Sequence, residues 1–333
     1  MQFLSDNAAA VHPAVWRAMQ AADEADAPYD GDRLSRRMDE VFSALFGQSC
    51  TAMWVSSGTA ANGLALAALV PPHGAVVCHR EAHIETSEAG APAFYTHGAK
   101  LILAEGEGAK LTPEAIAAVI DPIEQGVHYS QVQAISITQA SEYGLSYSPD
   151  ETAAIGAFAS SRGLGLHIDG ARFANSVAYR DCPPAALSCA AGASSLVFGC
   201  VKNGGMGAEA LVLFDPALAD LVRVRRKRAG HLQSKGRYMA AQVLALVEGD
   251  VWLENARAAN AAAQEIAGAA SGRLLHAVEA NEIFLKLSPQ ERAALRAQGF
   301  GFYDWGDDAA RMVTAWNSDS AVVAKLARAI SNL

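Results

Sequence analysis

The chain has 333 residues, of which 51% are hydrophobic and 18% are charged, and its formal net charge is −9 at pH 7. This composition excludes a disordered chain, a collagen-like repeat and a disulfide-rich scaffold. The acidic balance argues against a general binder of nucleic acids or of anionic membranes.

The first half of the chain alternates strand and helix signals. Residues 52–56 form an apolar strand candidate and residues 60–69 a helix candidate, and Ser57-Gly58-Thr59 joins them. Residues 131–139 are rich in β-forming side chains. The following Ser148-Pro149-Asp150-Glu151 has the pattern of a capped helix start. That helix is expected from Asp150 to Arg162, with Gly163 directly after it.

Three more apolar runs follow in the middle of the chain, at residues 164–169, 194–201 and 208–214. Strands that alternate with helices in this way are typical of a mostly parallel sheet covered by helices on both faces. We therefore expect an α/β fold in this part of the chain.

The pattern changes after about residue 237. An alanine-rich helical stretch over 238–270 precedes a strand candidate at 282–287, and Ser288-Pro289-Gln290-Glu291 then starts a helix that Gly299 ends. Strands near 301–305 and 312–316 precede a last helix after Ser318. The sequence thus predicts a large α/β domain with an N-terminal arm over 1–237 and a smaller α+β domain over 238–333.

Several features point to a cytoplasmic protein. The longest apolar run, Gly63 to Val70, stops at two prolines and is too short to span a bilayer. The N-terminus lacks the basic and long apolar regions of a signal peptide. Five cysteines with no Cys-x-x-Cys spacing indicate reduced thiols that pack as small apolar side chains. We expect no membrane or nucleic-acid partner and no metal site.

Two strand candidates end in groups that can do chemistry. Asp169 closes one apolar run and Lys202 closes another, and ligands of parallel α/β sheets bind at the carboxyl ends of strands. Such a pair suits pyridoxal 5'-phosphate, because the lysine can form a Schiff base and the carboxylate can keep the ring nitrogen protonated. Ser57-Gly58-Thr59 at a helix start would bind the phosphate. The alternative for Asp169 and Lys202 is a plain ion pair.

The motifs in this order resemble those of the threonine aldolases, within the β-eliminating lyase group of fold-type-I pyridoxal-phosphate enzymes. The resemblance extends over nearly the whole chain. It is most specific in two segments, HIDGAR at 167–172 and KNGGMGAEA at 202–210. Their sequences are similar to those of the bacterial low-specificity enzymes. It also includes Ser5-Asp6-Asn7, Tyr29-Asp30-Gly31-Asp32, His83 with Glu88-Ala89-Gly90, and Arg311-Met312-Val313-Thr314.

The resemblance implies a cofactor site for several of these residues. Lys202 would hold pyridoxal phosphate covalently, and Asp169 would face its ring nitrogen. Ser57, Gly58 and Thr59 would cradle the phosphate.

The resemblance also implies residues on the substrate side. His83 would stack on the cofactor ring, close to the β-hydroxyl of the substrate, and His128 is a second histidine placed near that hydroxyl. Ser5, Arg172 and Arg311 would hold the substrate carboxylate, for which paired guanidinium groups are well suited. Arg172 would contribute to the cofactor site as well.

This chain departs from the common family pattern in four places. Asn7 stands where many members have threonine, and residues 29–32 read YDGD where many have YGED. Residues 140–144 read ASEYG in place of the commoner ENTHN, and Asn203 replaces a glycine. These differences leave the substrate side chain and the base at the β-hydroxyl more open than the use of the cofactor.

The basic run at 223–235 loosely resembles the segment that supplies a phosphate-binding arginine in the family, and Lys235 is the candidate that the resemblance implies here. A nucleic-acid patch is the alternative for this run, but a solvated or phosphate-facing helix fits the net charge of −9 better.

Structural alternatives exist for the other candidates. His83 and His128 can be ordinary surface histidines. Arg172 and Arg311 can form structural ion pairs, which exposed arginines commonly do. Ser5 lies close to a terminus, where disorder is common.

The function that the resemblance implies is the cleavage of L-threonine, L-allo-threonine and related L-β-hydroxy-α-amino acids into glycine and an aldehyde. A β-elimination or a transamination would use the same Lys202 and Asp169 and is the alternative. A non-catalytic cofactor-binding protein is a further one. The resemblance also implies a homotetramer with active sites at subunit interfaces, to which residues 29–32 of a neighbour contribute.

Overall fold

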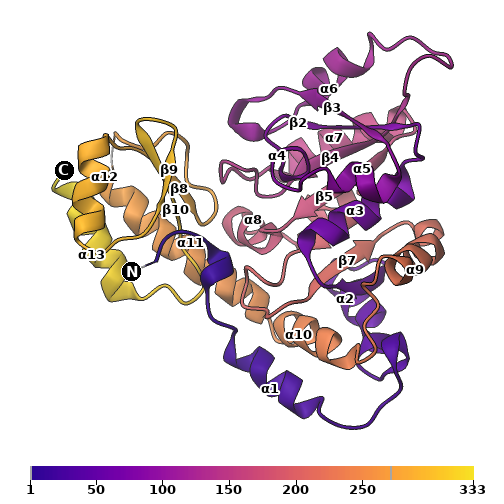
Figure 1. Ribbon diagram of the computed structural model, residues 1–333, viewed down its shortest axis with the longest axis horizontal. Coiled ribbons are helices and arrows are strands. Elements are labelled where there is room, and N and C mark those ends of the chain that lie inside the picture. Colours follow the sequence, from indigo (N-terminus) through magenta and orange to yellow (C-terminus); the bar gives the residue numbers. More distant parts are fainter. Residues whose placement is uncertain (1, 271) are drawn as a thin grey trace.

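The computed structural model describes residues 2–270 and 272–333. A large part built around a seven-stranded sheet and a smaller part built around a three-stranded sheet are connected by the long helix α11 (Val251–Ala269), as Figure 1 shows. The described residues contain no helix that is both long and apolar enough to cross a bilayer.

The strands of the described residues belong to these two sheets. They are β1 Thr51–Val55, β2 Ala75–His79, β3 Lys100–Ala104, β4 Val132–Thr138, β5 Gly165–Gly170, β6 Ser195–Phe198, β7 Glu209–Leu213, β8 Glu282–Lys286, β9 Tyr303–Trp305 and β10 Ala309–Val313.

The helices surround the large sheet and cover one face of the small one. Besides α11 they are α1 Pro13–Ala21, α2 Met38–Phe46, α3 Gly58–Leu69, α4 His83–Thr86, α5 Ala91–Thr96, α6 Pro113–Ile120, α7 Pro149–Ser161, α8 Phe173–Arg180, α9 Ala219–Arg228, α10 Arg237–Val247, α12 Pro289–Ala297 and α13 Ser320–Ser331.

The large sheet has the strand order β1-β7-β6-β5-β4-β2-β3. Only β7 runs antiparallel to its neighbours, β1 and β6, and the remaining pairs are parallel. The carboxyl ends of β1, β4, β5 and β6 therefore meet at one edge of the sheet, together with the amino end of the reversed β7. The mostly parallel α/β fold expected from the sequence is confirmed.

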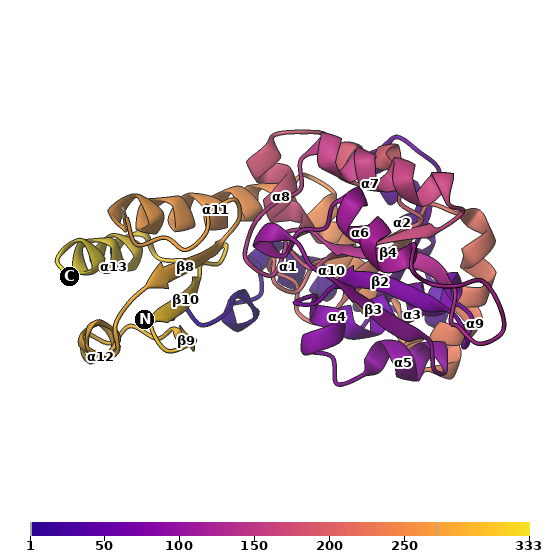
Figure 2. The same ribbon diagram turned by 90° about the horizontal axis from the view of Figure 1, so that it is seen from above.

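The two faces of this sheet are buried by different helices. Successive side chains of a strand point to opposite faces. Accordingly, Met53 and Val55 pack in the cluster beneath α3 and α9, whereas Ala52 and Trp54 pack in the cluster that includes α2, α7 and α8. Figure 2 shows α7 and α8 on one side of the strands and α3 and α5 on the other. Burial on both sides explains why the strands are continuous apolar runs.

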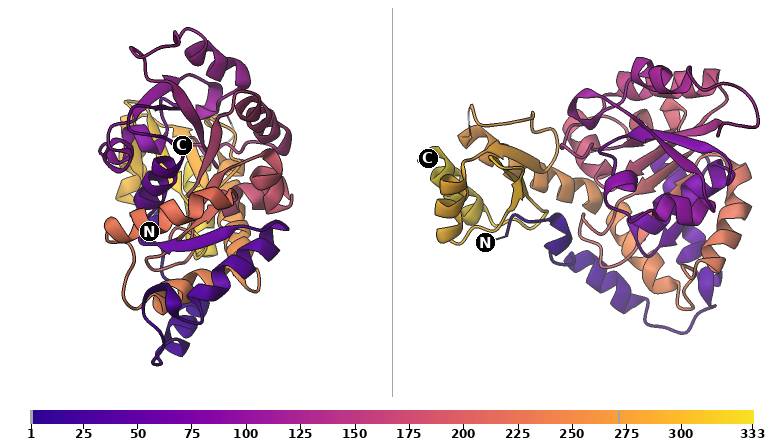
Figure 3. Two further views of the ribbon diagram at one scale, coloured as in Figure 1. Left: turned by 90° about the vertical axis from the view of Figure 1, so that its right-hand side faces the viewer. Right: turned by 45° about the horizontal axis from the view of Figure 1, so that its top comes forward.

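The smaller part is built from β8, β10 and β9, which are antiparallel, and from α12, α13 and the second half of α11. The N-terminal segment joins it, because the backbone N–H of Phe3 donates to Gly301 and Phe3 in turn accepts from Val313. The Phe3 ring is buried in the same apolar cluster. Figure 3 shows this segment lying against the small part before the chain enters the large one.

The packing shows where the sequence-based boundaries shift. The continuous helix expected over 238–270 is wrong: Gly249 and Asp250, at φ 89° and 61°, separate α10 from α11. The apolar cluster of the large part continues through α10 to Ala256. The division after residue 237 stays a prediction, and this packing favours a boundary inside α11.

Two expected strands also differ in their limits. The run expected over 194–201 ends as a strand at Phe198, because the chain turns there toward Lys202. The last strand spans Ala309–Val313, three residues earlier than the expected start at 312.

Candidate active site

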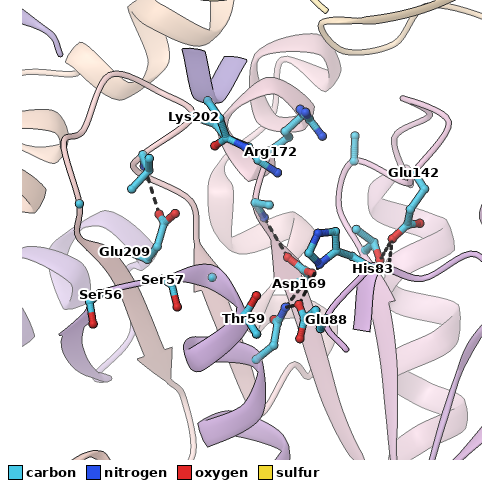
Figure 4. A pocket seen from close by; sticks show the side chains of 18 of the residues that line it. Ser56, Ser57, Thr59, His83, Glu88, Glu142, Asp169, Arg172, Lys202 and Glu209 are labelled. Carbon is cyan, nitrogen blue, oxygen red and sulfur yellow. Dashed lines mark hydrogen bonds and ion pairs between the residues drawn. The ribbon is translucent and has the colours of Figure 1, made fainter. Parts of the chain in front are cut away.

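A cavity of about 350 Å³ lies at the edge of the large sheet where β4, β5 and β6 end. This volume is within the range of small-molecule sites. Figure 4 shows side chains from α3, from the start of α4 and from the ends of these strands converging on it. The predicted Lys202, Asp169 and Arg172 are among its lining residues.

Lys202 lies on a turn that the sheet fixes from two sides. Gly199 packs so closely on the Ala171 carbonyl that a Cβ would stand 2.3 Å from that oxygen, so the two strand ends stay adjacent. The backbone N–H groups of Cys200 and Val201 donate to Glu209 Oε2 at 2.5 and 3.2 Å. Glu209 is the first residue of β7, and it lies at the site because β7 runs antiparallel to its neighbours.

The amine of Lys202 has no hydrogen bond or ion pair with any residue of 2–270 and 272–333. Burial, followed by the nearby charge of Arg172, lowers the pKa of Lys202. Burial also raises the pKa of Glu209 to about 7. A buried amine with a lowered pKa and a free Nζ is suited to nucleophilic chemistry.

Asp169 is held in a buried hydrogen-bond network. Its Oδ2 accepts from Asn62 Nδ2 at 2.9 Å and its Oδ1 from the backbone of Ala171 at 3.1 Å. The same Asn62 amide donates to Glu88 Oε1 at 2.9 Å. Asn62 lies one helical turn after Gly58 on α3, so the helix start and the carboxylate share one rigid support.

His83 is oriented by the same network. Its Nδ1 lies 2.8 Å from Glu88 Oε1, and the ring is 44% exposed toward the cavity. The hydrogen bond to Glu88 raises the pKa of His83, against the opposing effect of burial. The Nδ1–H therefore faces Glu88, which leaves Nε2 for a ligand.

His167 completes the network from below. Its Nε2 lies 3.0 Å from Asn62 Oδ1 and its Nδ1 lies 2.9 Å from Ser195 Oγ. Because Asn62 Oδ1 only accepts, Nε2 carries the proton and Nδ1 accepts from the serine. Full burial lowers the pKa of His167 to about 4, so the neutral ring fixes the orientation of the Asn62 amide.

The pKa of His167 makes stability depend on pH. The unfolded chain binds more protons than the folded one between pH 4 and 6.5, so the free energy of unfolding falls as the pH drops through this window. At about pH 5 the loss amounts to roughly 2 kcal/mol. We expect His167→Gln to lose correspondingly less stability than the wild type between about pH 7 and about pH 5 in urea unfolding. The exposed His73→Gln is the control; equal losses in all three proteins would contradict the assignment.

The N-terminus of α3 faces the cavity with unpaired donors. Ser57 caps the helix by accepting from the backbone of Ala60 at 3.2 Å. The Thr59 hydroxyl has no partner among the described residues, and a Cβ at Gly58 would meet nothing within 4 Å. The orphan N–H groups of a helix start and the helix dipole bind anions such as phosphate.

The predicted carboxylate-binding arginines lie in one charged cluster. Arg172 donates from Nε and Nη2 to Asp6 at 2.8 and 2.9 Å, and its Nη1 lies 3.1 Å from Glu282 Oε2. Arg311 donates to Glu282 Oε1 at 2.6 Å. Burial alone would raise the pKa of Asp6, but the charge of Arg172 holds this pKa below its usual value. Arg172 lines the cavity, and Arg311 stands behind it on the other side of Glu282.

The structure brings most of the predicted residues together. The cavity is lined by Ser57, Gly58, Thr59, His83, Asp169, Arg172 and Lys202.

Four predicted residues do not line this cavity within one chain. His128 is exposed and precedes β4, at the opposite end of the sheet. Lys235 is exposed before α10, and Arg311 is bound to Glu282. The hydroxyl of Ser5 accepts from the Asn7 backbone and lies at a separate hollow beside α13.

The sequence assigned no role to several polar residues that line the site, among them Asn62, Glu88, Glu142 and Glu209. Asn62 follows Gly58 by one helical turn, and Glu142 follows a buried strand end. Both positions are visible in the sequence and indicate side chains at this edge of the sheet.

His83, Glu88 and Asp169 also place three atoms of metal-ligand type within 4.8 Å of one another. Hydrogen bonds from Asn62 and His83 already link these carboxylates. These hydrogen bonds explain, without a metal ion, why the three side chains lie so close together.

Comparison with known proteins agrees with this geometry. Residues 2–289 match the β-eliminating lyase family. The chain is 41% identical to a low specificity L-threonine aldolase of Pseudomonas aeruginosa, covering 99% of this chain and 96% of that one. It is 40% identical to an enzyme of the same name from a Pseudomonas species, covering 98% and 96%.

A solved structure of the Leishmania major threonine aldolase has the same fold, with a TM-score of 0.93, 24% identity and coverage of 99% and 98%. The full-length similarity and the shared fold lead to one conclusion. The chain belongs to the threonine aldolases of the β-eliminating lyase family.

Proposed function

We propose that this protein is a pyridoxal-phosphate-dependent lyase that cleaves L-threonine, L-allo-threonine and related L-β-hydroxy-α-amino acids to glycine and an aldehyde, acetaldehyde in the case of threonine. One observation carries the proposal: a single cavity holds the free amine of Lys202, the buried carboxylate of Asp169 and the open start of α3 at Gly58. The names of the Pseudomonas relatives point to the same substrates.

The residues of the cavity fit the cofactor. The unpartnered Nζ of Lys202 is available for a covalent bond to an aldehyde carbon. The free hydroxyl of Thr59 and the backbone of Gly58 suit a phosphate. Asp169 is held in place by hydrogen bonds from two donors, and its carboxylate can stabilise a protonated ring nitrogen. When bound, the cofactor supplies an electron sink for the pair of electrons left at the substrate Cα.

The chain itself binds and orients the substrate. Of the five N–H groups of a guanidinium, Arg172 uses two on Asp6 and directs Nη1 toward Glu282, so one N–H on Nη2 and one on Nη1 remain for a substrate carboxylate. Holding the carboxylate fixes the rotation about the bonds to Cα and thereby selects the Cα–Cβ bond for cleavage. His83 Nε2 faces the β-oxygen, since Nδ1 is engaged with Glu88, and it donates to that oxygen when the ring is protonated, a form that the raised pKa of His83 favours.

Arg311 acts on this step through Glu282. If Arg311 is removed, Glu282 loses its hydrogen-bonded partner and draws Arg172 toward itself. We expect Arg311→Ala to raise KM for L-threonine by roughly 10- to 100-fold, as the loss of a charged hydrogen bond does, with a smaller change in kcat. Steady-state kinetics check this prediction. An unchanged KM would contradict an action of Arg311 on Arg172 through Glu282.

The homotetramer forms part of the proposal. His128, Lys235 and residues 29–32 lie outside the cavity of their own chain, so any contribution from them has to come from a neighbouring subunit. Within the chain, Asp30 is bound to Arg226 and Tyr29 contacts the amine of Lys227.

The proposal is tested by offering the cofactor-loaded enzyme L-threonine, L-allo-threonine, and L-alanine as a substrate without a β-hydroxyl. Release of acetaldehyde from the first two and not from L-alanine is expected. Formation of a keto acid in place of glycine would instead indicate elimination or transamination.

A further inference from the structure

We propose that Glu142 takes the proton from the β-hydroxyl of the substrate and is therefore a catalytic residue. This inference rests on the lyase function proposed above. It concerns a residue of the 140–144 segment, in which the chain departs from the common family pattern.

Glu142 is fixed at the cavity wall by one of its two carboxylate oxygens. Oε1 accepts from the Thr138 hydroxyl at 2.8 Å and from the backbone N–H of His83 at 2.8 Å. One hydrogen bond comes from the end of β4 and the other from the start of α4, so the carboxylate is held between two elements of the site. Figure 4 shows it beside His83, on the side of the cavity opposite Glu209.

The second oxygen of Glu142 is left without a partner. Oε2 is buried and makes no hydrogen bond within residues 2–270 and 272–333. A buried polar atom without a partner is costly, and in a native structure it needs an explanation. A substrate hydroxyl donating to Oε2 would supply the missing hydrogen bond.

The surroundings of Glu142 suit proton transfer near neutral pH. Burial raises the pKa of Glu142 to about 7, and the charge of Asp169 acts in the same direction, against the two hydrogen bonds to Oε1. A general base works best when its pKa is close to the operating pH. The titratable groups that face Glu142 are His83 of α4, Asp169 of β5, Cys78 of β2, and Tyr143 and Tyr147 of its own loop.

The histidines are less suited to accept this proton. The hydrogen bond with Glu88 raises the pKa of His83, which favours the protonated ring and makes His83 a better donor than acceptor. His128 is exposed and lies outside the cavity of its own chain. In this arrangement Glu142 accepts the proton of the β-hydroxyl and His83 donates a hydrogen bond to its oxygen.

The proton balance of the step closes within the substrate. The β-O–H bond breaks and its proton moves to Glu142 Oε2, while the Cα–Cβ bond breaks and the aldehyde C=O bond forms. The electron pair of the broken carbon–carbon bond stays with Cα. Glycine then takes up one proton at Cα, and Glu142 returns to its ionised form by giving up the one that it received.

The test is the pH dependence of kcat/KM for L-threonine in wild type and Glu142→Gln. In the wild type, kcat/KM should rise with pH through about 7, because only the ionised carboxylate accepts the proton. Glu142→Gln should lower kcat/KM by at least about 100-fold and abolish this rising limb. Its visible absorbance should stay that of the loaded wild type. Glu85→Gln, which removes an exposed carboxylate from α4, the short helix whose first residue donates to Glu142, is the control and should keep the limb.

Thr138→Val gives a second, independent readout. Loss of the hydroxyl that donates to Oε1 removes a contribution that lowers the pKa of Glu142. The limb should therefore move to higher pH, which a purely structural role of Glu142 would not produce. If Glu142→Gln does not fold, Thr138→Val alone tests whether Glu142 is the base.

The two proposals fail in different ways. Absence of aldehyde release by the loaded wild type would contradict the proposed function. The role of Glu142 is overturned if the wild type cleaves L-threonine and Glu142→Gln keeps both its activity and the rise of kcat/KM with pH. It is also overturned if Thr138→Val leaves the pH of that rise unchanged.

Discussion

Replacing Lys202 by alanine is expected to abolish the visible absorbance of the loaded enzyme and to reduce kcat by on the order of 10⁴-fold or more, as loss of a covalent catalytic group does. The reason lies in the local structure. Lys202 is the one lysine that lines the cavity within the described residues, and its amine has no partner there. Its lowered pKa increases the fraction of neutral amine that can form the covalent bond.

The fold should tolerate this change, because no hydrogen bond or ion pair of the described residues involves the Lys202 amine. Circular dichroism and the unfolding midpoint should therefore stay close to those of the wild type. Lys100→Ala, at the exposed amino end of β3, is the matched control and should retain absorbance and turnover. An unchanged visible spectrum of Lys202→Ala would exclude Lys202 as the attachment point.

Asp169→Asn is expected to cause the second largest loss, on the order of 10²- to 10⁴-fold in kcat, together with weaker retention of the cofactor. The substitution keeps the shape of the side chain and removes only its charge. That charge lies at the base of the cavity, where two donors hydrogen-bond to the carboxylate. Without it, a protonated ring nitrogen loses its counter-charge, and the electron sink is weakened.

Glu88→Gln separates this effect from a general disturbance of the network. Glu88 shares the Asn62 amide with Asp169, but it acts on the site through His83. We expect a smaller loss of kcat in Glu88→Gln and no loss of cofactor after gel filtration. Equal effects of both variants, with equal cofactor loss, would contradict the assigned role of Asp169.

Strand-end residues were the part of the site that the sequence could predict. Buried parallel strands are apolar runs, so a charged residue that closes such a run stands out, as Asp169 and Lys202 do. The capped start of α3 is a local signal as well. These three features depend on short segments and on the rule that strand carboxyl ends share an edge.

Residues that act through packing could not be predicted in the same way. Asn62 meets Asp169 and His167 across distances of 107 and 105 residues in sequence, and Glu209 reaches the site only because β7 runs antiparallel to its neighbours. No local sequence pattern predicts these contacts between distant segments.

The helix break at Gly249 and Asp250 was missed because the alanine-rich pattern continues on both sides of it. His128 illustrates the opposite case. The resemblance places it at the site, whereas within its own chain it lies before β4, away from the cavity.

The most direct test of the account is the stoichiometry of products from L-threonine with pyridoxal phosphate added and Lys202→Ala run in parallel. Cleavage of the Cα–Cβ bond predicts glycine and acetaldehyde in equal amounts from the wild type and neither product from the variant. A cofactor-loaded wild type that consumes L-threonine without forming glycine would contradict the account, because the bond broken would then be another one.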